Sequence, residues 1–453
     1  MTQRCPLTPP PAPRDARPDL DPVTESPVSS MAQGARSVDQ QDAAEPSLRR
    51  NRDFRTVLVG QGISAVGDAI SVTTMPLLVL ALTGSGLQMG IVGVLQRLPD
   101  LLFGLPAGAY ADRWDRRRMM LWADAGRAVL TALVPLAALL SLPVMGTVLL
   151  VSFPINVCRV LFMAGWTAAV PNLVDRRQLG RAMGAFEAVS GGSFIIGPAI
   201  AGILVGIIGA GPTLAIDAAS FAVSAFSLAL IHRPLRRTDR QPSTALRHEM
   251  AEGVRFIVHH RVLRDTIAFW SAVSLVSAPV IPAVTYYVTI DRGLGPAAFG
   301  LVVSAYSVGT LVGALLGGRR MSGRLAPRLL LGNLLVAFST AAVALTGSLP
   351  LMVVFALVSG AFQSVALVAY ITVRAASTPD ELLGRVGSTA RTISLGFQPV
   401  GLLLGGVLLD ALHGGPTLLI IAALTGALSL LFALSPAIRE AQAIPASHHP
   451  SGR

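Results

Sequence analysis

Residues 108–118 read Gly108-Ala-Tyr-Ala-Asp112-Arg113-Trp-Asp115-Arg116-Arg117-Arg118 and directly follow a long apolar run. The stretch gathers four arginines and two aspartates, and a second apolar run begins immediately after it. A tight polar loop between two lipid-spanning helices, on the side where arginine accumulates, is typical of a cytoplasmic hairpin. We therefore expect a membrane protein with several spans.

The composition agrees with a protein of the bilayer. The chain has 453 residues, of which 52% are hydrophobic and 13% charged, and such a chain is too apolar for an ordinary soluble protein. The net charge of +11 comes from arginines in short loops between apolar runs, so it indicates membrane topology and not nucleic-acid binding. Cys5 and Cys158 predict no disulfide framework and no metal site, and we expect no cofactor.

From Phe54 onward the chain is a series of apolar runs, most of them near the ~20 residues needed to cross a ~30 Å hydrocarbon core. We predict an all-α polytopic membrane protein with twelve transmembrane helices in two six-helix bundles. The expected spans are 54–82, 87–110, 119–141, 144–170, 183–209, 212–231, 263–290, 296–318, 327–346, 349–373, 387–412 and 414–434.

The connections between the spans alternate in kind. One set is short and carries a single arginine, Arg292, whereas the other set holds the remaining loop arginines. Arginine-rich loops face the cytoplasm by the positive-inside rule, so we expect both termini inside the cell and an even number of spans. This topology places the chain in the plasma membrane as a multi-pass protein.

The spans also predict how the chain is divided. We expect a disordered cytoplasmic tail at 1–52, a first bundle at 53–231, a cytoplasmic linker at 232–262, a second bundle at 263–435 and a C-terminal tail at 436–453. Apolar residues recur at helical spacing within the linker, which predicts an amphipathic helix. Leu179-Gly180-Arg181 recurs as Leu383-Gly384-Arg385, which indicates that the bundles are duplicated units in parallel orientation.

Twelve spans, two matching halves and the pattern Gly108-x-x-x-Asp112-Arg113-x-x-Arg116-Arg117 together resemble the major facilitator superfamily over residues 54–434. The resemblance implies that this loop forms a gate on the cytoplasmic side. In that case Asp112 is the gate anion, Arg116 is its cationic partner, and Gly108 allows close helix approach. Arg113 belongs to the same signature but also suits a simple topology anchor. The second-half counterpart has Ser322 in place of the aspartate.

Four short sequence motifs resemble those of the branch that holds macrolide-type and enterobactin-type exporters. The motifs are Gly67-Asp68-Ala69, Leu98-Pro99, Gly197-Pro198-x-x-Ala201-Gly202 and Ile216-Asp217-Ala-Ala-Ser-Phe221. The third of these resembles the Gly-Pro signature of antiporters. Pro198 removes a backbone donor and kinks the helix, while Gly197 and Gly202 let neighbouring helices lie close.

Several charges fall inside the expected spans. Asp68 lies ~20 Å along span one and Arg97 ~15 Å into span two from the opposite side, so both are near mid-membrane. An isolated charge at that depth costs at least ~2.5–3.5 kcal/mol on insertion scales. We expect Asp68 either to line a polar cavity and take up a proton, or to pair with Arg97, for which Asp100 competes.

Other intramembrane charges are weaker candidates. Arg159 lies mid-depth in span four, and Glu187, about one turn into span five, is expected to pair with Arg159 or a hairpin arginine, or to couple protons. Asp124 and Arg127 are spaced as a local i, i+3 pair or as part of the gate network. Asp217 is expected near the outer end of span six.

The second half has fewer charges in its spans. Its expected cavity candidates, with packing favoured for most of the aromatics, are Tyr286, Tyr287, Tyr306, Phe362, Gln363, Arg391 and Gln398. Charged groups in one half and apolar walls in the other suit a hydrophobic or cationic amphiphilic substrate.

The sequence contains no Walker loop, nucleophile elbow or Rossmann fingerprint, so we do not expect an enzyme or an ATP-driven pump. The leading hypothesis is a monomeric transporter that exports a small amphipathic or hydrophobic compound, such as a drug, antibiotic or siderophore-like molecule, by proton antiport with alternating access. Uptake of a small metabolite, lipid flipping and a non-transporting sensor on the same fold remain alternatives.

Overall fold

The computed structural model describes residue 48 and residues 51–174, 176–231, 246–319 and 325–436. Residues Asn51–Arg453 form one compact unit, distinct from Met1–Arg50. Nearly all of the expected N-terminal tail, the start of the linker at 232–245 and the C-terminal tail from 437 lie outside the described residues.

The described chain is a succession of helices. The first half is formed by α2 (Arg52–Thr83), α3 (Gly86–Arg113), α4 (Arg116–Leu139), α5 (Val144–Leu173), η1 (Arg176–Gln178), α6 (Leu179–Ile208) and α7 (Ala210–Ala229). After the linker helix α8 (Leu246–His259), the second half is formed by α9 (Arg261–Ser277), α10 (Val280–Tyr286), η2 (Tyr287–Asp291), α11 (Gly295–Arg319), α12 (Leu325–Leu345), α13 (Leu349–Ala376), η3 (Asp380–Leu382), α14 (Leu383–Gly396), α15 (Gln398–Leu412) and α16 (Gly414–Ala433).

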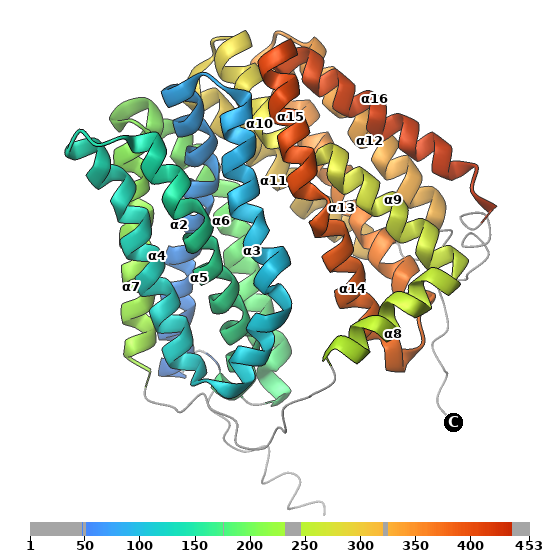
Figure 1. Cartoon of the computed structure of the whole chain (residues 1–453), viewed down its shortest axis with the longest axis horizontal. Coiled ribbons are helices and arrows are strands. Elements are labelled where there is room, and N and C mark those ends of the chain that lie inside the picture. Colours follow the sequence, from blue (N-terminus) through green and yellow to red (C-terminus); the bar gives the residue numbers. More distant parts are fainter. Residues whose placement is uncertain (1–47, 49–50, 175, 232–245, 320–324, 437–453) are drawn as a thin grey trace, which may run out of the picture. The chain divides into compact units, whose positions relative to one another are not determined.

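These helices confirm the expected all-α polytopic fold. In the described part of the chain, 11 helical stretches are long and apolar enough to cross a membrane. The helix α3 has 28 residues and supplies the remaining predicted span, with Arg97 and Asp100 in its interior. The first half lies at the left of Figure 1, in blue to green, and the second half at the right, in yellow to red.

Short polar residues set where the first helices begin and end. The side chains of Asn51, Ser85 and Asp115 each accept a backbone N–H three residues on, at 3.1, 3.2 and 3.2 Å, and so cap α2, α3 and α4. Gly84 ends α2 with a left-handed φ of 64°. Asp115, in the hairpin that joins α3 to α4, therefore has a structural role as a helix cap.

Two spans that the sequence predicts as continuous helices are broken in the structure. The seventh span divides into α9 and α10 at Ala278-Pro279, where the proline cannot donate a backbone hydrogen bond. The eleventh span divides into α14 and α15 at Phe397, two residues before Pro399. Beside these breaks α15 lies close to α9 and α10, because Gly401 and Gly405 leave room for Leu275 and Pro279.

Each half has its own packing, and several helix pairs join the halves, two of them by extensive contact. In the first half α2 packs against α6 and α7, and α4 against α5 and α7; in the second half α13 packs against α11 and α12. Across the halves, α6 packs against α11 and α3 against α15. Smaller contacts of α2 and α3 with α10, α11 and α14 also cross between the halves, so relative motion of the halves must change all of these contacts.

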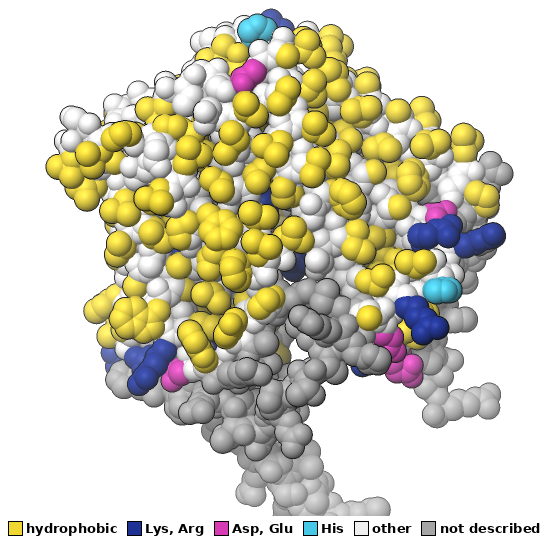
Figure 2. Space-filling view, viewed as in Figure 1, with side chains coloured by type: hydrophobic (Ala, Val, Ile, Leu, Met, Phe, Trp, Pro, Cys, Tyr) yellow, Lys and Arg dark blue, Asp and Glu magenta, His cyan; other side chains and the backbone are white. Residues whose placement is uncertain are grey.

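The two ends of the bundles differ in their loops. We call the end that carries residues 84–85, 209, 292–294 and 413 the short-loop end, and the end that carries Asp115 and Arg177 the arginine-loop end. Hydrophobic side chains cover most of the face seen in Figure 2, and the described charged side chains on it are few, at the top, at the lower left and along the right edge. This distribution is the one that a lipid bilayer requires.

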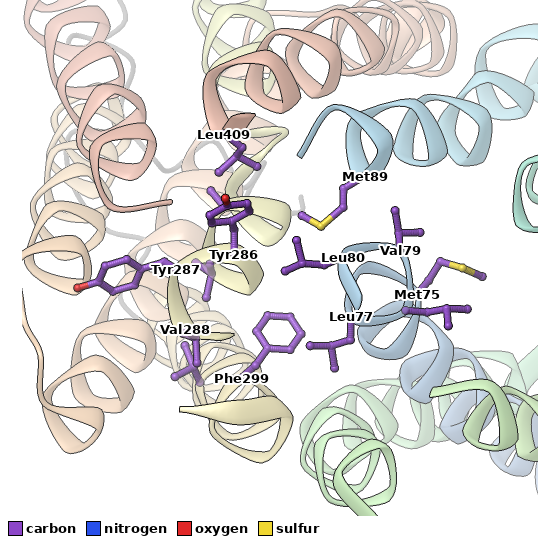
Figure 3. Packing of buried hydrophobic residues seen from close by; sticks show 14 of the residues in the cluster. Met75, Leu77, Val79, Leu80, Met89, Tyr286, Tyr287, Val288, Phe299 and Leu409 are labelled. Carbon is purple, nitrogen blue, oxygen red and sulfur yellow. The ribbon is translucent and has the colours of Figure 1, made fainter. Parts of the chain in front are cut away.

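An apolar cluster joins the halves at the short-loop end. It combines Leu77 and Leu80 of α2 and Met89 of α3 with Phe299 of α11 and Leu409 of α15, all of them buried. Figure 3 shows these side chains pointing toward one another, with Tyr286 beside them. Because the cluster excludes water between the halves, we call it the apolar plug.

Candidate functional site

A buried arginine on α4 holds together two carboxylates from two helices. Arg127 forms an ion pair with Asp68 of α2 and a second, at 3.4 Å, with Asp124 one turn earlier on α4. Its guanidinium carbon also lies 3.8 Å from the ring centroid of Phe221 on α7. The Arg127 side chain is 4% exposed, whereas that of Asp68 is 36% exposed. Asp68 is therefore the member of the group that solvent reaches.

Hydroxyl groups extend this network to α7. Ser224 donates to Asp124 and also accepts from the amide of Gln61 at 2.7 Å. Asp217 is 2% exposed and accepts hydrogen bonds from Ser71 and, at 3.1 Å, from Ser220. We call Asp68, Asp124, Arg127 and Asp217, with their serine partners, the carboxylate network.

The helical period explains how the network forms. Gln61, Asp68 and Ser71 lie on one face of α2 because they are spaced by seven and three residues. Asp217, Ser220 and Ser224 have the same kind of spacing on α7. Gly67 lets these faces meet, since a Cβ there would lie 2.1 Å from Ser220 Oγ and 2.4 Å from Asp217 Oδ1.

The charges of the carboxylate network do not cancel. The network contains three carboxylates and one guanidinium. Two of the carboxylates, Asp68 and Asp124, contact Arg127, and Asp217 interacts electrostatically with both Asp68 and Arg127. The carboxylate network therefore holds an excess of formal negative charge inside the spans. In a low-dielectric region an excess of negative charge favours proton uptake.

A second ion pair lies between α3 and α5. Arg159 donates to Asp100 at 2.5 Å and to the side chain of Asn156 at 3.0 Å. The Arg159 and Asp100 side chains are 33% and 19% exposed. Arg97 is exposed and interacts electrostatically with both members of the pair.

These contacts correct several expected pairings. The alternative of an Asp68–Arg97 ion pair is wrong. Asp68 forms its ion pair with Arg127, and Arg97 lies near Asp100 and Arg159 instead. Arg159 pairs with Asp100 and not with Glu187, which is exposed on α6. Asp217, expected near the outer end of span six, is buried in α7 and accepts a hydrogen bond from Ser71 of α2.

The arginines of the α3–α4 hairpin hold helix ends. Arg116, which is buried, donates to the carbonyl of Ala168 in α5 at 2.9 Å. Arg117 donates to the carbonyls of Leu228, at 2.9 Å, and Ala229, and so caps the last turn of α7. Both contacts place a cation at the negative end of a helix.

The surroundings of Gly108 and the side chains of Asp112 and Arg113 lie outside the part of the chain that the structure describes, and so does Ser322. The assignment of Asp112 and Arg116 as a gate pair thus stays a prediction.

The two glycines of the Gly-Pro motif in α6 pack against two different helices. A Cβ at Gly197 would lie 2.4 Å from the Cβ of Ala69, so this glycine lets α6 approach α2 within the first half. A Cβ at Gly202 would lie 2.5 Å from the carbonyl oxygen of Pro296, so this one lets α6 approach α11. Beside Pro198, the N–H of Ala199 donates to Ser304 Oγ at 3.0 Å, across the two halves.

The linker helix α8 is attached to the second half. Glu252 forms an ion pair with Arg385 of α14, and a Cβ at Gly253 would meet Thr389 Oγ1 at 2.8 Å. Ile257 is buried, whereas Val254 and Val258 are exposed. The apolar stripe that the sequence predicts is therefore divided between packing and the surface.

Two of the second-half cavity candidates belong to the short-loop end. Tyr287 is buried and donates to the carbonyls of Ala344 and Thr346 at 2.8 and 2.7 Å. Tyr286 adjoins the apolar plug and lies 3.2 Å from His413 Nδ1 through its hydroxyl. Both are packing residues, because their rings fill the closed contact at this end.

A multi-span helical fold with ion pairs inside its spans is typical of membrane transporters that are built from two helical bundles. The family model described as "Transmembrane secretion effector" matches residues 46–452. The chain therefore belongs to the transmembrane secretion effector family of the major facilitator superfamily, and the expected resemblance to the macrolide-type efflux branch is confirmed.

Two relatives illustrate the family. The chain is 30% identical over 400 residues to the multidrug efflux pump Tap of Mycobacterium tuberculosis (strain ATCC 25618 / H37Rv), covering 86% of this chain and 94% of the relative. It is 26% identical over 366 residues to macrolide efflux protein A of Streptococcus pyogenes, covering 79% of this chain and 89% of the relative.

Solved structures share the fold at low sequence identity. A variant of the nucleoside transporter NupG matches with a TM-score of 0.73 and 12% identity, covering 84% of this chain and 99% of the other. A bacterial homologue of the lysosomal transporter Spinster matches with a TM-score of 0.69 and 13% identity, covering 90% of this chain and all of the other. These likenesses concern the fold alone.

Proposed function

We propose that the protein exports a small amphipathic or hydrophobic compound across the plasma membrane in exchange for protons, by alternating access between its two halves. The carboxylate network carries this proposal, because it combines a buried excess of negative charge with one carboxylate, Asp68, that solvent reaches. A group that exchanges protons with water while it holds helices together is what proton coupling needs.

The closed short-loop end supports the alternating-access part of the proposal. Apolar packing, the α6–α11 crossing and the α3–α15 crossing join the halves there. By the positive-inside rule the short-loop end faces the outside of the cell, and we therefore expect Asp68 to exchange protons with the cytoplasmic side in this state. Opening of the outer end would then expose the same carboxylate to the opposite side.

The proposed direction of transport and the proposed substrate class rest on the names of the two relatives. Both are named as efflux proteins, one for multiple drugs and one for macrolides. The distribution of charge adds a physical reason, since the carboxylate network of the first half has more carboxylates than arginines and can balance a cationic group.

We expect Asp68→Asn to abolish export driven by a pH gradient while leaving substrate exchange at zero gradient largely intact. The amide cannot release a proton, but it keeps the size of the side chain and can still accept a hydrogen bond from Arg127. The measurement compares uptake of erythromycin or ethidium into inverted vesicles under an imposed pH gradient with counterflow in its absence.

The matched control is Asp380→Asn, which removes an exposed carboxylate from η3, away from the spans. It is expected to transport like the unaltered protein in both assays. Gradient-driven uptake by Asp68→Asn at the unaltered rate would contradict the assignment of Asp68, and loss of the folded protein from the membrane would assign it a structural role instead.

A further inference from the structure

A carboxylate of the second half caps a helix of the first. Asp410, on the last turn of α15, accepts the N–H of Gly86 with one oxygen. Its other oxygen accepts the hydroxyl of Ser85 at 2.8 Å and the N–H of Leu87 at 3.1 Å. These residues form the N-terminus of α3, so the contact crosses the boundary between the halves at the short-loop end.

The electrostatics of both helices favour this contact. The first N–H groups of α3 have no partner within their own helix and carry the positive end of its dipole, which attracts a carboxylate. On α15 the same carboxylate lies at the negative end, where a charge of this sign is unfavourable. Its favourable interactions therefore come from α3 across the boundary.

Close packing brings the two helix ends within reach. A Cβ at Gly86 would lie 2.3 Å from the Cβ of Leu409, and a Cβ at Gly406 would lie 2.7 Å from the carbonyl oxygen of Gly86. Leu409 and Met89 of these helices also belong to the apolar plug (Figure 3). The hydrogen bonds of Asp410 are thus formed in the same arrangement that closes the plug.

We propose that Asp410 is a latch for the outer gate, which holds the short-loop end closed by capping α3 and must release α3 whenever that end opens. This inference rests on the proposed transport cycle, in which the halves separate at the short-loop end. When they separate, the N–H groups of Gly86 and Leu87 lose a charged acceptor.

The test measures opening of the short-loop end without substrate or a proton gradient. A cysteine replaces Met89, which is buried in the plug, in a chain that also carries Cys5→Ser and Cys158→Ala. A membrane-impermeant maleimide is added to the full-length protein in right-side-out vesicles. Asp410→Ala is expected to raise the labelling rate at this cysteine on the order of tenfold, because each lost hydrogen bond to a charged group favours the open state. Asp410→Asn, which keeps one acceptor oxygen, should give an intermediate rate.

The matched control is Asp291→Ala. Asp291 also lies at the short-loop end and accepts a backbone N–H, that of Gly415 at 2.9 Å, but both residues belong to the second half. We expect its labelling rate to equal that of the unaltered protein. An unchanged rate for Asp410→Ala, or an equal increase for both variants, would overturn the latch. Faster labelling in Asp410→Ala alone would support the latch even if transport proved to be independent of protons.

Discussion

Replacing Arg127 with methionine is expected to remove most of the folded protein from the membrane. Methionine keeps much of the side-chain volume but leaves Asp68 and Asp124 without their cation, and it ends the stacking on Phe221. Removing one partner of a buried ion pair costs about 3–5 kcal/mol, which is a large fraction of a typical total stability of about 5–15 kcal/mol. The measurement is the yield and the thermal midpoint of the detergent-extracted protein.

A rebalanced variant separates folding from function. Combining Arg127→Met with Asp68→Asn and Asp124→Asn removes the cation and two of the three carboxylates together, and replacing a whole buried ion cluster is often nearly neutral for stability. We expect this variant to recover the folded yield but not gradient-driven transport. Arg159→Met should lower the yield of folded protein less than Arg127→Met does, because the Arg159–Asp100 pair is partly exposed. A normal yield of Arg127→Met would show that the network does not stabilise the first half.

The second large effect is expected at Gly202. Its Cβ would lie 2.5 Å from the carbonyl oxygen of Pro296 and 3.0 Å from the Cα of Ala297, and these backbone atoms of α11 cannot rotate away. Gly202→Val should therefore hold α6 and α11 apart, abolish transport and speed maleimide labelling of a cysteine at Met89. The helix itself should persist, because α6 keeps its other packing against α2.

Gly206 provides the control for this experiment. It lies one turn further along the same helix, and a Cβ there would meet nothing within 4 Å. Gly206→Val introduces the same side chain and the same change of helix propensity without a clash. It should transport nearly normally. Equal loss of transport in the two variants would show that α6 is sensitive to valine itself and not to its crossing with α11.

The fold could be predicted because length and polarity alone select a membrane span. A run of about 20 apolar residues between arginine-bearing loops has few alternatives in a bilayer, and the helices agree with the expected series. The breaks at Pro279 and Phe397 could not be predicted with the same ease, because a proline in a membrane helix can either kink it or end it.

The site could be predicted only in part. Charges such as Asp68 and Arg159 stand out in an apolar run, but depth along a span does not say which helix a side chain faces. Asp68 and Arg97 have similar depths, yet Arg127 of α4 takes Asp68. The position of Asp217 along its own span does not reveal its hydrogen bond with Ser71 on the neighbouring helix. Asp410 is recognisable in the sequence as an acidic residue just before the Leu412–Gly414 turn. Its contact with Gly86 cannot be predicted from the sequence.

Proton antiport requires that protons leave a vesicle as exported molecules enter it. Inverted vesicles that contain the protein are energised so that their interior is acidic, and erythromycin or ethidium is added while a dye reports the internal pH. We predict that the added compound raises the internal pH in vesicles with the unaltered protein and not in those with Asp68→Asn, and that uptake stops when the gradient is collapsed. Uptake that continues at the same rate after the gradient is collapsed would contradict the account.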